Sequence, residues 1–212
     1  MNVGVVDVYE VDLGAHGWSD DVIDALVPPH ERTAPHASRV VRALTRHLLG
    51  LRLVTDPAAV PITRVCERCG HPTHGRPRLA EGPVFGATHS GDRALVAVAD
   101  GPSALGVDLE VIRPRADLDR LAARVLDRDE LATWRSGPAA DALERFLAAW
   151  TAREAYLKAL GVGIATDLCA VPARPAGWWV TALPASAGCV AALAVPGGAL
   201  RIVPQPAGSF EP

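Results

Sequence analysis

The stretch PAADALERFLAAWTAREAYLKAL, residues 138–160, decides the fold because it predicts one long helix around which the rest of the chain is organised. Pro138 suits a first helical turn, and Gly161 suits a stop just past the last turn. At about 100° per residue, the large apolar side chains share one arc of this helix: Leu143, Phe146, Leu147, Trp150 and Leu157. Glu154 falls in the middle of this arc.

Glu154 needs a physical explanation, because an ionised carboxylate on a buried stripe is costly unless a cation, a metal ion or hydrogen bonds meet it. Arg153 and Lys158 flank Glu154 on the two sides of the arc. The pattern therefore indicates a site for a metal ion or a phosphate. An internal ion pair that closes the core is the equal alternative.

Composition places the chain among soluble globular proteins of one large domain or two small ones. It has 212 residues, of which 49% are hydrophobic and 21% charged, and its formal net charge is 21 − 24 = −3. This balance excludes a global field that would favour nucleic acid or an anionic membrane. No apolar run reaches the roughly 18 residues of a membrane-spanning helix, and the N-terminus lacks the basic segment of a secretion signal. We therefore expect a cytoplasmic protein with reduced cysteines.

Apolar periodicity and turn residues predict an α+β fold in which strands and helices alternate twice along the chain. Strands are expected at residues 2–11, 84–88, 94–99, 105–109, 179–183, 189–195 and 200–203. Helices are expected at residues 20–27, 35–49, 118–125, 128–135 and 138–160, with Gly50 as the stop of the second. This order indicates two similar halves that join near residues 100–104.

Two patterns in the first half of the chain admit both a binding role and a structural one. The candidate ligands of a zinc ion are Cys66, Cys69, His71 and His74. The histidines follow too closely for a zinc finger, so a tight turn with two reduced thiols, followed by the basic loop Gly75-Arg76-Pro77, is favoured. The second pattern is a row of arginines on the helix expected at residues 35–49, read as a solvated face rather than an anion contact: Arg39, Arg42 and Arg46.

The segment GVDLE, residues 106–110, ends a predicted strand with two acids. Asp108 and Glu110 are two apart, so both point to one face and repel each other unless a cation lies between them. Carboxylate oxygens suit Mg²⁺, which also binds phosphate oxygens. Glu154 adds a third carboxylate, a number that suits Mg²⁺ on a pyrophosphate. Residues 88–91, THSG, end another predicted strand, where phosphate sites tend to be built.

These motifs carry a resemblance. GVDLE followed about 40 residues later by WTAREAYLKALGVG resembles the 4′-phosphopantetheinyl transferases, specifically the large surfactin-synthetase-activator type. The family pattern is G-[IV]-D-[IL]-E and then W-[TS]-x-K-E-[AS]-x-x-K. The upstream segments CERCGHPTHGRP and ATHSG are similar to those that precede the first motif, so the resemblance covers residues 62–168 well and the rest by length and order. Arg153 departs from the pattern, since the family usually has lysine there and the two are not interchangeable at a phosphate.

The resemblance implies transfer of the 4′-phosphopantetheine arm of coenzyme A to a serine of an apo acyl or peptidyl carrier protein, with release of 3′,5′-ADP. Mg²⁺, or Mn²⁺ in its place, is the implied cofactor, and the carrier belongs to fatty acid, polyketide or nonribosomal peptide synthesis. The implied fold is a pseudo-dimer of two α+β halves, residues 1–102 and 103–212, each a small antiparallel sheet packed with helices. The active site is expected in the cleft between the halves of a monomer, without nucleic acid or membrane partners.

By the same resemblance, Asp108, Glu110 and Glu154 hold Mg²⁺ on the coenzyme pyrophosphate. The implied coenzyme contacts are Arg76, Thr88, His89, Asp108, Arg153 and Lys158. General chemistry agrees, because attack of a serine hydroxyl on a phosphoanhydride builds charge on the phosphoryl oxygens and on the leaving group. We therefore expect Glu154 to take the serine proton and Lys158 to neutralise or protonate the leaving phosphate.

Carrier proteins of this kind are typically acidic near the acceptor serine, which suggests a docking role for the arginines that follow the two acids. These are Arg113, Arg115, Arg120 and Arg124. Two other functions compete with the transferase. One is a different Mg²⁺-dependent transferase or hydrolase acting on a phosphoanhydride, although no GxxxxGK[ST] or GxGxxG segment is present. The other is a non-catalytic binding module with a structural zinc at Cys66 and Cys69.

Overall fold

The computed structural model describes residues 4–64, 70, 75–162 and 167–206, and it has the mixed α+β class expected from the sequence. The helices are α1 (Asp20–Leu26), α2 (His36–Leu53), α3 (Leu118–Val125), α4 (Arg128–Ser136) and α5 (Ala142–Leu160). The strands are β1 (Val5–Asp12), β2 (Thr63–Arg64), β3 (Pro77–Arg78), β4 (Val84–Ser90), β5 (Arg93–Ala99), β6 (Gly106–Val111), β7 (Trp178–Leu183), β8 (Cys189–Pro196) and β9 (Arg201–Gln205).

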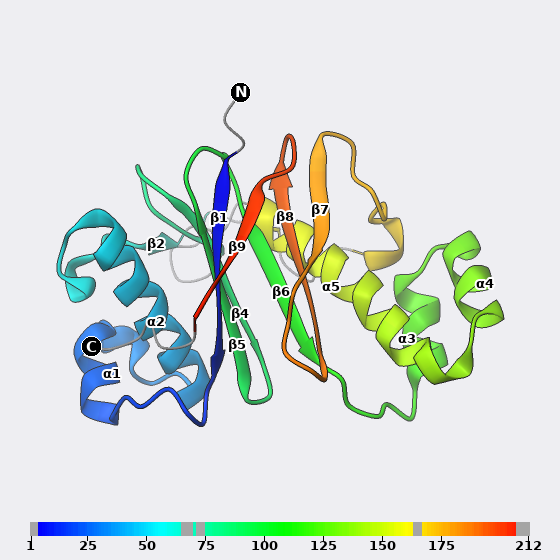
Figure 1. The fold of residues 1–212 in the computed structure, drawn as a ribbon, viewed down its shortest axis with the longest axis horizontal. Helices are drawn as coiled ribbons and strands as arrows, with labels where there is room; N and C mark the ends of the chain where they lie inside the picture. Colours follow the sequence, from blue (N-terminus) through cyan, green and yellow to red (C-terminus); the bar gives the residue numbers. More distant parts are fainter. Residues whose placement is uncertain (1–3, 65–69, 71–74, 163–166, 207–212) are drawn as a thin grey trace.

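The first sheet has the strand order β4-β5-β1-β9 and carries α2 on one face (Figure 1). Its strand β5 is buried on both faces, and successive side chains of a strand point to opposite faces. One set of its side chains joins the apolar cluster that contains α2: Ala94, Val96 and Val98. The alternate set joins the cluster between this sheet and the second one: Leu95, Ala97 and Ala99. The two sheets therefore pack face to face through β5.

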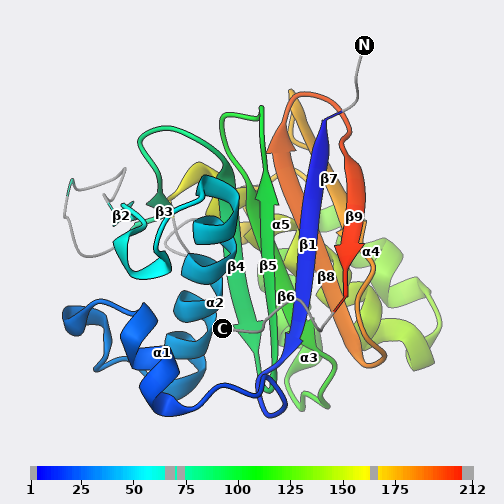
Figure 2. The same ribbon diagram turned by 60° about the vertical axis from the view of Figure 1, so that its left-hand side comes forward.

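The second sheet has the order β6-β8-β7, and α5 covers its outer face, so that α2, the two sheets and α5 form successive layers (Figures 1 and 2). Small residues line the contact between α5 and β8: Ala155, Ala159, Ala192 and Ala194. On β6, a Cβ atom added to Gly106 would lie 2.1 Å from the carbonyl oxygen of Ala155. The backbone of α5 thus lies directly on β6, which fixes the acids of β6 relative to α5.

The end of α2 differs from the prediction. The helix continues through Gly50 to Leu53, because Gly50 serves a close approach rather than a stop. A Cβ atom at Gly50 would lie 3.0 Å from the carbonyl oxygen of Thr55 and 3.0 Å from Cγ of Pro57. The helix ends at Val54, which adopts a left-handed conformation with φ 52°.

Of the two predicted ends of α5, only the C-terminal one is confirmed. Pro138 does not begin the helix, because a 3₁₀ turn at Ala139–Asp141 intervenes and α5 starts at Ala142. Gly161 ends the helix as expected, with φ 74° and its N–H directed to the carbonyl groups of the last turn. Gly161 therefore predicts the end of this helix correctly, whereas Pro138 does not predict its start.

The last strand returns to the first sheet. β9 pairs in parallel with β1, so the C-terminal part of the chain completes the sheet built by N-terminal strands. The first sheet is therefore mixed, and not antiparallel throughout as expected. The boundary between residues 102 and 103 stays a prediction. In the part of the chain that the structure describes, no helix is both long enough and apolar enough to span a membrane.

Candidate active site

Two strands from different sheets, β4 and β6, lie side by side and are joined through their side chains. The Thr88 hydroxyl donates to Oδ1 of Asp108 at 3.2 Å, and the Ser90 hydroxyl donates to Oε2 of Glu110 at 2.9 Å. Because residues two apart on a strand share a face, the two hydroxyls meet the two carboxylates in step. Both acids therefore lie on the side of β6 that faces β4.

Lys158 brings a cation from α5 to these strands. Its Nζ lies 2.5 Å from Oδ1 of Asp108 and 3.0 Å from Oγ1 of Thr88. Asp108 is only 4% exposed, and burial raises its pKa while the Lys158 ammonium acts in the opposite direction. A buried carboxylate needs a cation or hydrogen bonds to remain ionised, and Lys158 supplies both.

Glu154 lies one helical turn before Lys158 on α5 and is buried as well. Burial raises its pKa, the charges of Asp108 and Glu110 raise it further, and Lys158 lowers it. The three carboxylates are thus close enough to influence one another. A carboxyl group with a raised pKa accepts a proton at a pH nearer to neutrality, which is the property required of a general base.

The donor chemistry of this cluster fits a divalent cation. Oδ2 of Asp108 and Oε1 of Glu154 are buried side-chain oxygens without a hydrogen-bond partner, and carboxylate oxygens are the ligands that Mg²⁺ prefers. Within the described ranges, however, no three histidine, cysteine, aspartate or glutamate side chains are arranged as a ready metal-ligand group. The Lys158 ammonium is instead the cation on Asp108. The metal set of Asp108, Glu110 and Glu154 stays a prediction.

A cavity of about 330 Å³ lies beside Lys158, between β4, β6 and the C-terminal end of α5. Its lining includes Arg76, Pro77, Gly106, Lys158 and Gly161. The guanidinium of Arg76 donates from Nη1 to the carbonyl oxygen of Ala159 at 2.6 Å. Because the last carbonyl groups of a helix lack partners within the helix, Arg76 both ties the 75–78 segment to α5 and adds positive charge to the cavity.

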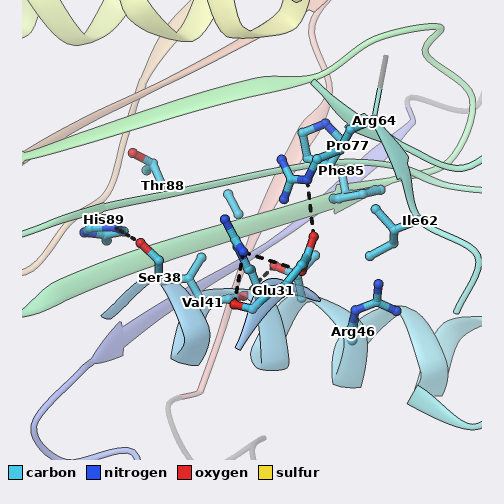
Figure 3. Close-up of a pocket in the computed structure, with 13 residues that line it drawn as sticks. Glu31, Ser38, Val41, Arg46, Ile62, Arg64, Pro77, Phe85, Thr88 and His89 are labelled. Atoms are coloured by element: carbon cyan, nitrogen blue, oxygen red, sulfur yellow. Dashed lines mark hydrogen bonds and ion pairs between the residues drawn. The ribbon is translucent and has the colours of Figure 1, made fainter. Parts of the chain in front are cut away.

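A second cavity, of about 190 Å³, lies between α2 and β4 (Figure 3). Its charged lining is one acid and three arginines: Glu31, Arg42, Arg46 and Arg64. Glu31 lies 3.5 Å from Nε of Arg64 and 3.7 Å from Nη1 of Arg42. The arginines exceed the single acid, so this cavity suits an anion such as a phosphate.

Thr88 and His89, both implied coenzyme contacts, are neighbours on β4. Neighbouring residues on β4 point to opposite faces, so Thr88 meets Asp108 whereas Nε2 of His89 lies 3.3 Å from the hydroxyl of Ser38 on α2 (Figure 3). Burial lowers the pKa of His89, and the charge of Lys158 lowers it further. Both residues line the arginine-lined cavity, and Thr88 in addition contacts the carboxylate cluster through Asp108.

Comparison with known proteins assigns the family. Residues 104–181 match the model of the 4′-phosphopantetheinyl transferase superfamily. The 4′-phosphopantetheinyl transferase HetI of Nostoc sp. is 34% identical over 199 residues, which cover 88% of this chain and 81% of HetI. The chain belongs to the 4′-phosphopantetheinyl transferase family. This transferase is also 32% identical to psf-1 of Bacillus pumilus over 136 residues, 63% of this chain and 55% of that protein, and 38% identical to AcpT of Escherichia coli K12 over 89 residues, 41% and 45%.

Contacts within the protein hold the side chain of Arg153 in this transferase. It is 2% exposed, and its guanidinium donates to the carboxylate of Glu130 at 2.5 Å and to the carbonyl oxygens of Leu168 and Ala149. These contacts direct the side chain to α4 and to the 3₁₀ turn at Leu168–Ala170, and the expected coenzyme contact of Arg153 stays a prediction. The internal ion pair, considered above for the acid Glu154, is formed by its neighbour.

Several residues near the site were not assigned an individual role from the sequence. Each of them contacts a charged residue that is distant in the sequence. Ser90 bonds to Glu110, and Glu31 pairs with Arg64 and Arg42. Only Ser90 carried a local signal, because it follows Thr88 by two positions and therefore shares its face of β4. The candidate zinc residues Cys66, Cys69, His71 and His74 lie outside the described residues.

The four arginines proposed for docking differ in their surroundings. Arg113 packs over the β4–β5 turn, where a Cβ atom at Gly91 would lie 2.1 Å from its Nη2. Arg115 lies 3.6 Å from Glu110, and Arg120 pairs with Asp117 at 2.8 Å. Arg120 and Arg124 are both exposed on α3, so this helix presents positive charge to the solvent.

Proposed function

We propose that this transferase moves the 4′-phosphopantetheine arm of coenzyme A to a serine of an apo carrier protein and releases 3′,5′-ADP. The observation that supports this most directly is the convergence of Asp108 from β6 with Glu154 and Lys158 from α5. Family membership supports the transfer itself. The cation-rich surroundings of Lys158, Arg76 and the arginine-lined cavity support a substrate with several phosphate groups.

Proton transfer is assigned to Glu154. In the proposed step, the serine oxygen forms a bond to the β-phosphorus of coenzyme A, and the bond from this phosphorus to the bridging oxygen breaks. Glu154 takes the hydroxyl proton, and the electron pair of the broken bond remains on the α-phosphate of the leaving 3′,5′-ADP. The one-turn spacing of Glu154 and Lys158 on α5 supports this role, because it places the proton acceptor beside the cation that contacts Asp108.

Charge stabilisation is assigned to Lys158. We place the pyrophosphate beside its ammonium, where it would neutralise the charge that develops on the leaving phosphate. Asp108 and Thr88 hold this ammonium in place. A bound Mg²⁺, or Mn²⁺ in its place, would be held by Asp108, Glu110 and Glu154 and would polarise the phosphoryl oxygens.

The coenzyme is proposed to span the two cavities, which share Pro77, Phe85 and Ala87 at the edge of β4. Arg76 would contact it from the cavity beside Lys158. Its 3′-phosphate would lie near His89, in the arginine-lined cavity, because that cavity holds an excess of positive charge. This placement keeps every phosphate group within reach of a cation.

The finer architecture is part of the same proposal. We infer two similar halves, residues 1–102 and 103–212, in which β9 of the second half completes the sheet of the first. The active site is placed in the cleft where β4 of the first half meets β6 of the second. The layered arrangement supports this, because each sheet is covered by one long helix. The carrier would dock on the arginines of α3 and of the segment before it, with its acidic surface towards Arg120 and Arg124.

The reaction is tested by mixing the protein with coenzyme A, Mg²⁺ and an apo carrier and measuring 3′,5′-ADP by chromatography. Nucleotide release that depends on both the carrier and the divalent ion is expected. A parallel reaction with dephospho-coenzyme A, in which the released nucleotide is 5′-AMP, tests the placement of the 3′-phosphate and should be much slower. Release without a carrier would indicate a hydrolase and contradict the proposal.

A further inference from the structure

The proposed chemistry does not use Arg153, although its charged side chain is buried and makes several hydrogen bonds. Nη2 lies 2.5 Å from Oε2 of Glu130, Nη1 lies 3.2 Å from the carbonyl oxygen of Ala149, and Nε lies 3.3 Å from that of Leu168. The guanidinium therefore joins three segments: α5, the start of α4 and the 3₁₀ turn that follows α5. It does so directly beside Glu154 in the sequence.

Glu130 has a second task at the start of α4. Its Oε2 also accepts the backbone N–H of Asp127 at 2.9 Å, and the Asp127 side chain in turn accepts the N–H groups of Asp129 and Glu130. This reciprocal arrangement is a capping box, which sets where a helix begins. Arg153 thus binds the residue that determines the start of α4.

The helices α3 and α4 form one arm of the molecule, which projects beyond α5 (Figure 1). Arg135 of α4 makes a two-point ion pair with Asp119 of α3, at 2.9 and 2.8 Å. The Cys169 thiol contacts the carbonyl oxygen of Leu126 at 3.4 Å, close to the link between the two helices. Because these contacts join the two helices, a shift in the start of α4 should also move α3, which carries Arg120 and Arg124.

We propose that Arg153 is a positioning residue for carrier recognition, which holds the α3–α4 arm at a set place relative to Glu154. The inference rests on the proposed function, because it takes the exposed arginines of α3 as the docking surface. Arg153 does not touch the coenzyme in this account. It acts through Glu130 on the position at which the carrier serine is presented.

Arginine is specifically suited to this task. Its planar fork carries donors in several directions, and here it uses Nε, Nη1 and Nη2 on three different acceptors. A lysine has one compact ammonium and a shorter reach, so it cannot serve all three at once. The lysine variant should therefore retain the charge beside Glu130 but lose hydrogen bonds to the other segments.

The test compares Arg153→Lys and Glu130→Gln with the wild type, using Arg174→Lys as the matched control, since Arg174 is exposed on the same half of the chain. The Michaelis constant for the carrier should rise by between about tenfold and a hundredfold in Arg153→Lys, on the scale of a misplaced substrate. The Michaelis constant for coenzyme A should change by less than about twofold, within the range of uncoupled sites. Glu130→Gln should act in the same direction, and Arg174→Lys should leave both constants unchanged.

Hydrogen exchange supplies a readout that does not depend on the carrier. In Arg153→Lys, amides of residues 127–136 should exchange faster, because the start of α4 loses an anchor. A rise in the coenzyme constant with an unchanged carrier constant would overturn the inference and restore a coenzyme contact. A lower melting temperature with both constants unchanged would overturn it in favour of a merely structural role. Absence of transfer by the wild type would refute the proposed function, whereas unchanged exchange in residues 127–136 would refute the tie itself.

Discussion

The ammonium of Lys158 lies 2.5 Å from Oδ1 of Asp108, although the two residues are separated by 50 positions in the chain. This contact connects the long helix α5 to the strand β6 and occupies one oxygen of a buried carboxylate. The other oxygen, Oδ2, has no hydrogen-bond partner. Lys158 and a divalent ion would therefore share one acid, and each would influence the binding of the other.

Removal of the Lys158 charge should tighten divalent-ion binding to the coenzyme-free protein. Two unit charges repel each other by about 1 to 4 kcal/mol at 4 Å, depending on the local dielectric constant, and the double charge of the divalent ion doubles this repulsion. We expect Lys158→Met to bind Mn²⁺ at least about tenfold more tightly than the wild type, measured by electron paramagnetic resonance of free Mn²⁺. Lys158→Arg retains the charge and should show no such gain. Equal affinity in all three proteins would contradict the shared site.

Removal of the Glu154 proton acceptor should affect turnover far more than coenzyme binding. Glu154→Gln is expected to lower kcat by about 10² to 10⁴, the usual contribution of a general base. The Kd for coenzyme A, measured by calorimetry, should change little. Glu144→Gln is the matched control, because Glu144 lies on the same helix but is exposed. Near-normal turnover in Glu154→Gln would show that another group takes the proton.

Charge reversal on α3 should weaken the carrier interaction alone. We expect Arg120→Glu with Arg124→Glu to raise the Michaelis constant of an acidic carrier by about tenfold at low salt and less at high salt. Arg201→Glu carries the same type of change at an exposed position on β9 and should have no effect. Initial rates at two ionic strengths provide the measurement. Equal rises for the carrier and for coenzyme A would refute docking on α3.

The parts of the fold that the sequence predicted well are those with local periodicity. The apolar arc of α5 and its terminal Gly161 are both visible in the sequence, and the helix ends where expected. The end of α2 was not predictable in this way, because Gly50 packs against Pro57 of the following loop. The parallel pairing of β9 with β1 joins opposite ends of the chain and has no local signal.

The features of the candidate site also differ in whether they have a local signal in the sequence. The i, i+2 spacing of Asp108 and Glu110 and the one-turn spacing of Glu154 and Lys158 could be read from the chain. The pairing of Lys158 with Asp108 required the packing of α5 on β6. The pairing of Arg153 with Glu130 was not predictable either, because Glu130 comes from another helix. The apolar periodicity of one helix does not show which neighbouring element contacts its flanks.

Close packing of α5 on β6 should make Gly106 intolerant of any side chain. A Cβ atom there would lie 2.1 Å from the Ala155 oxygen and 2.5 Å from the Ala159 nitrogen, both backbone atoms. We expect Gly106→Ala to lower the free energy of unfolding by about 1–3 kcal/mol, as overpacking usually does. Gly198→Ala is the control, because nothing lies within 4 Å of its Cβ position. Urea denaturation measures both, and equal stability of the two variants would contradict the packing.

Acid should destabilise the protein partly through His47. This residue packs against Trp18, with ring centroids 5.5 Å apart, and burial lowers its pKa below the usual 6.5. Below about pH 6.5 the unfolded chain therefore binds more protons than the folded protein. The contribution of neutral His47 to the free energy of unfolding is complete above about pH 6.5 and is lost as the pH falls towards the lowered pKa. His47→Phe should therefore lose less unfolding free energy than the wild type between about pH 8 and about pH 5. The exposed His30→Gln should behave as the wild type, and equal losses in all three would contradict the assignment.

The most direct test of the central claim is the intact mass of an apo carrier after incubation with coenzyme A, Mg²⁺ and this protein. The account predicts a gain equal to one phosphopantetheine arm, which is absent when the acceptor serine of the carrier is replaced by alanine and is strongly reduced with Glu154→Gln. An unchanged carrier mass across acyl and peptidyl carriers, with a folded protein and intact coenzyme, would contradict it.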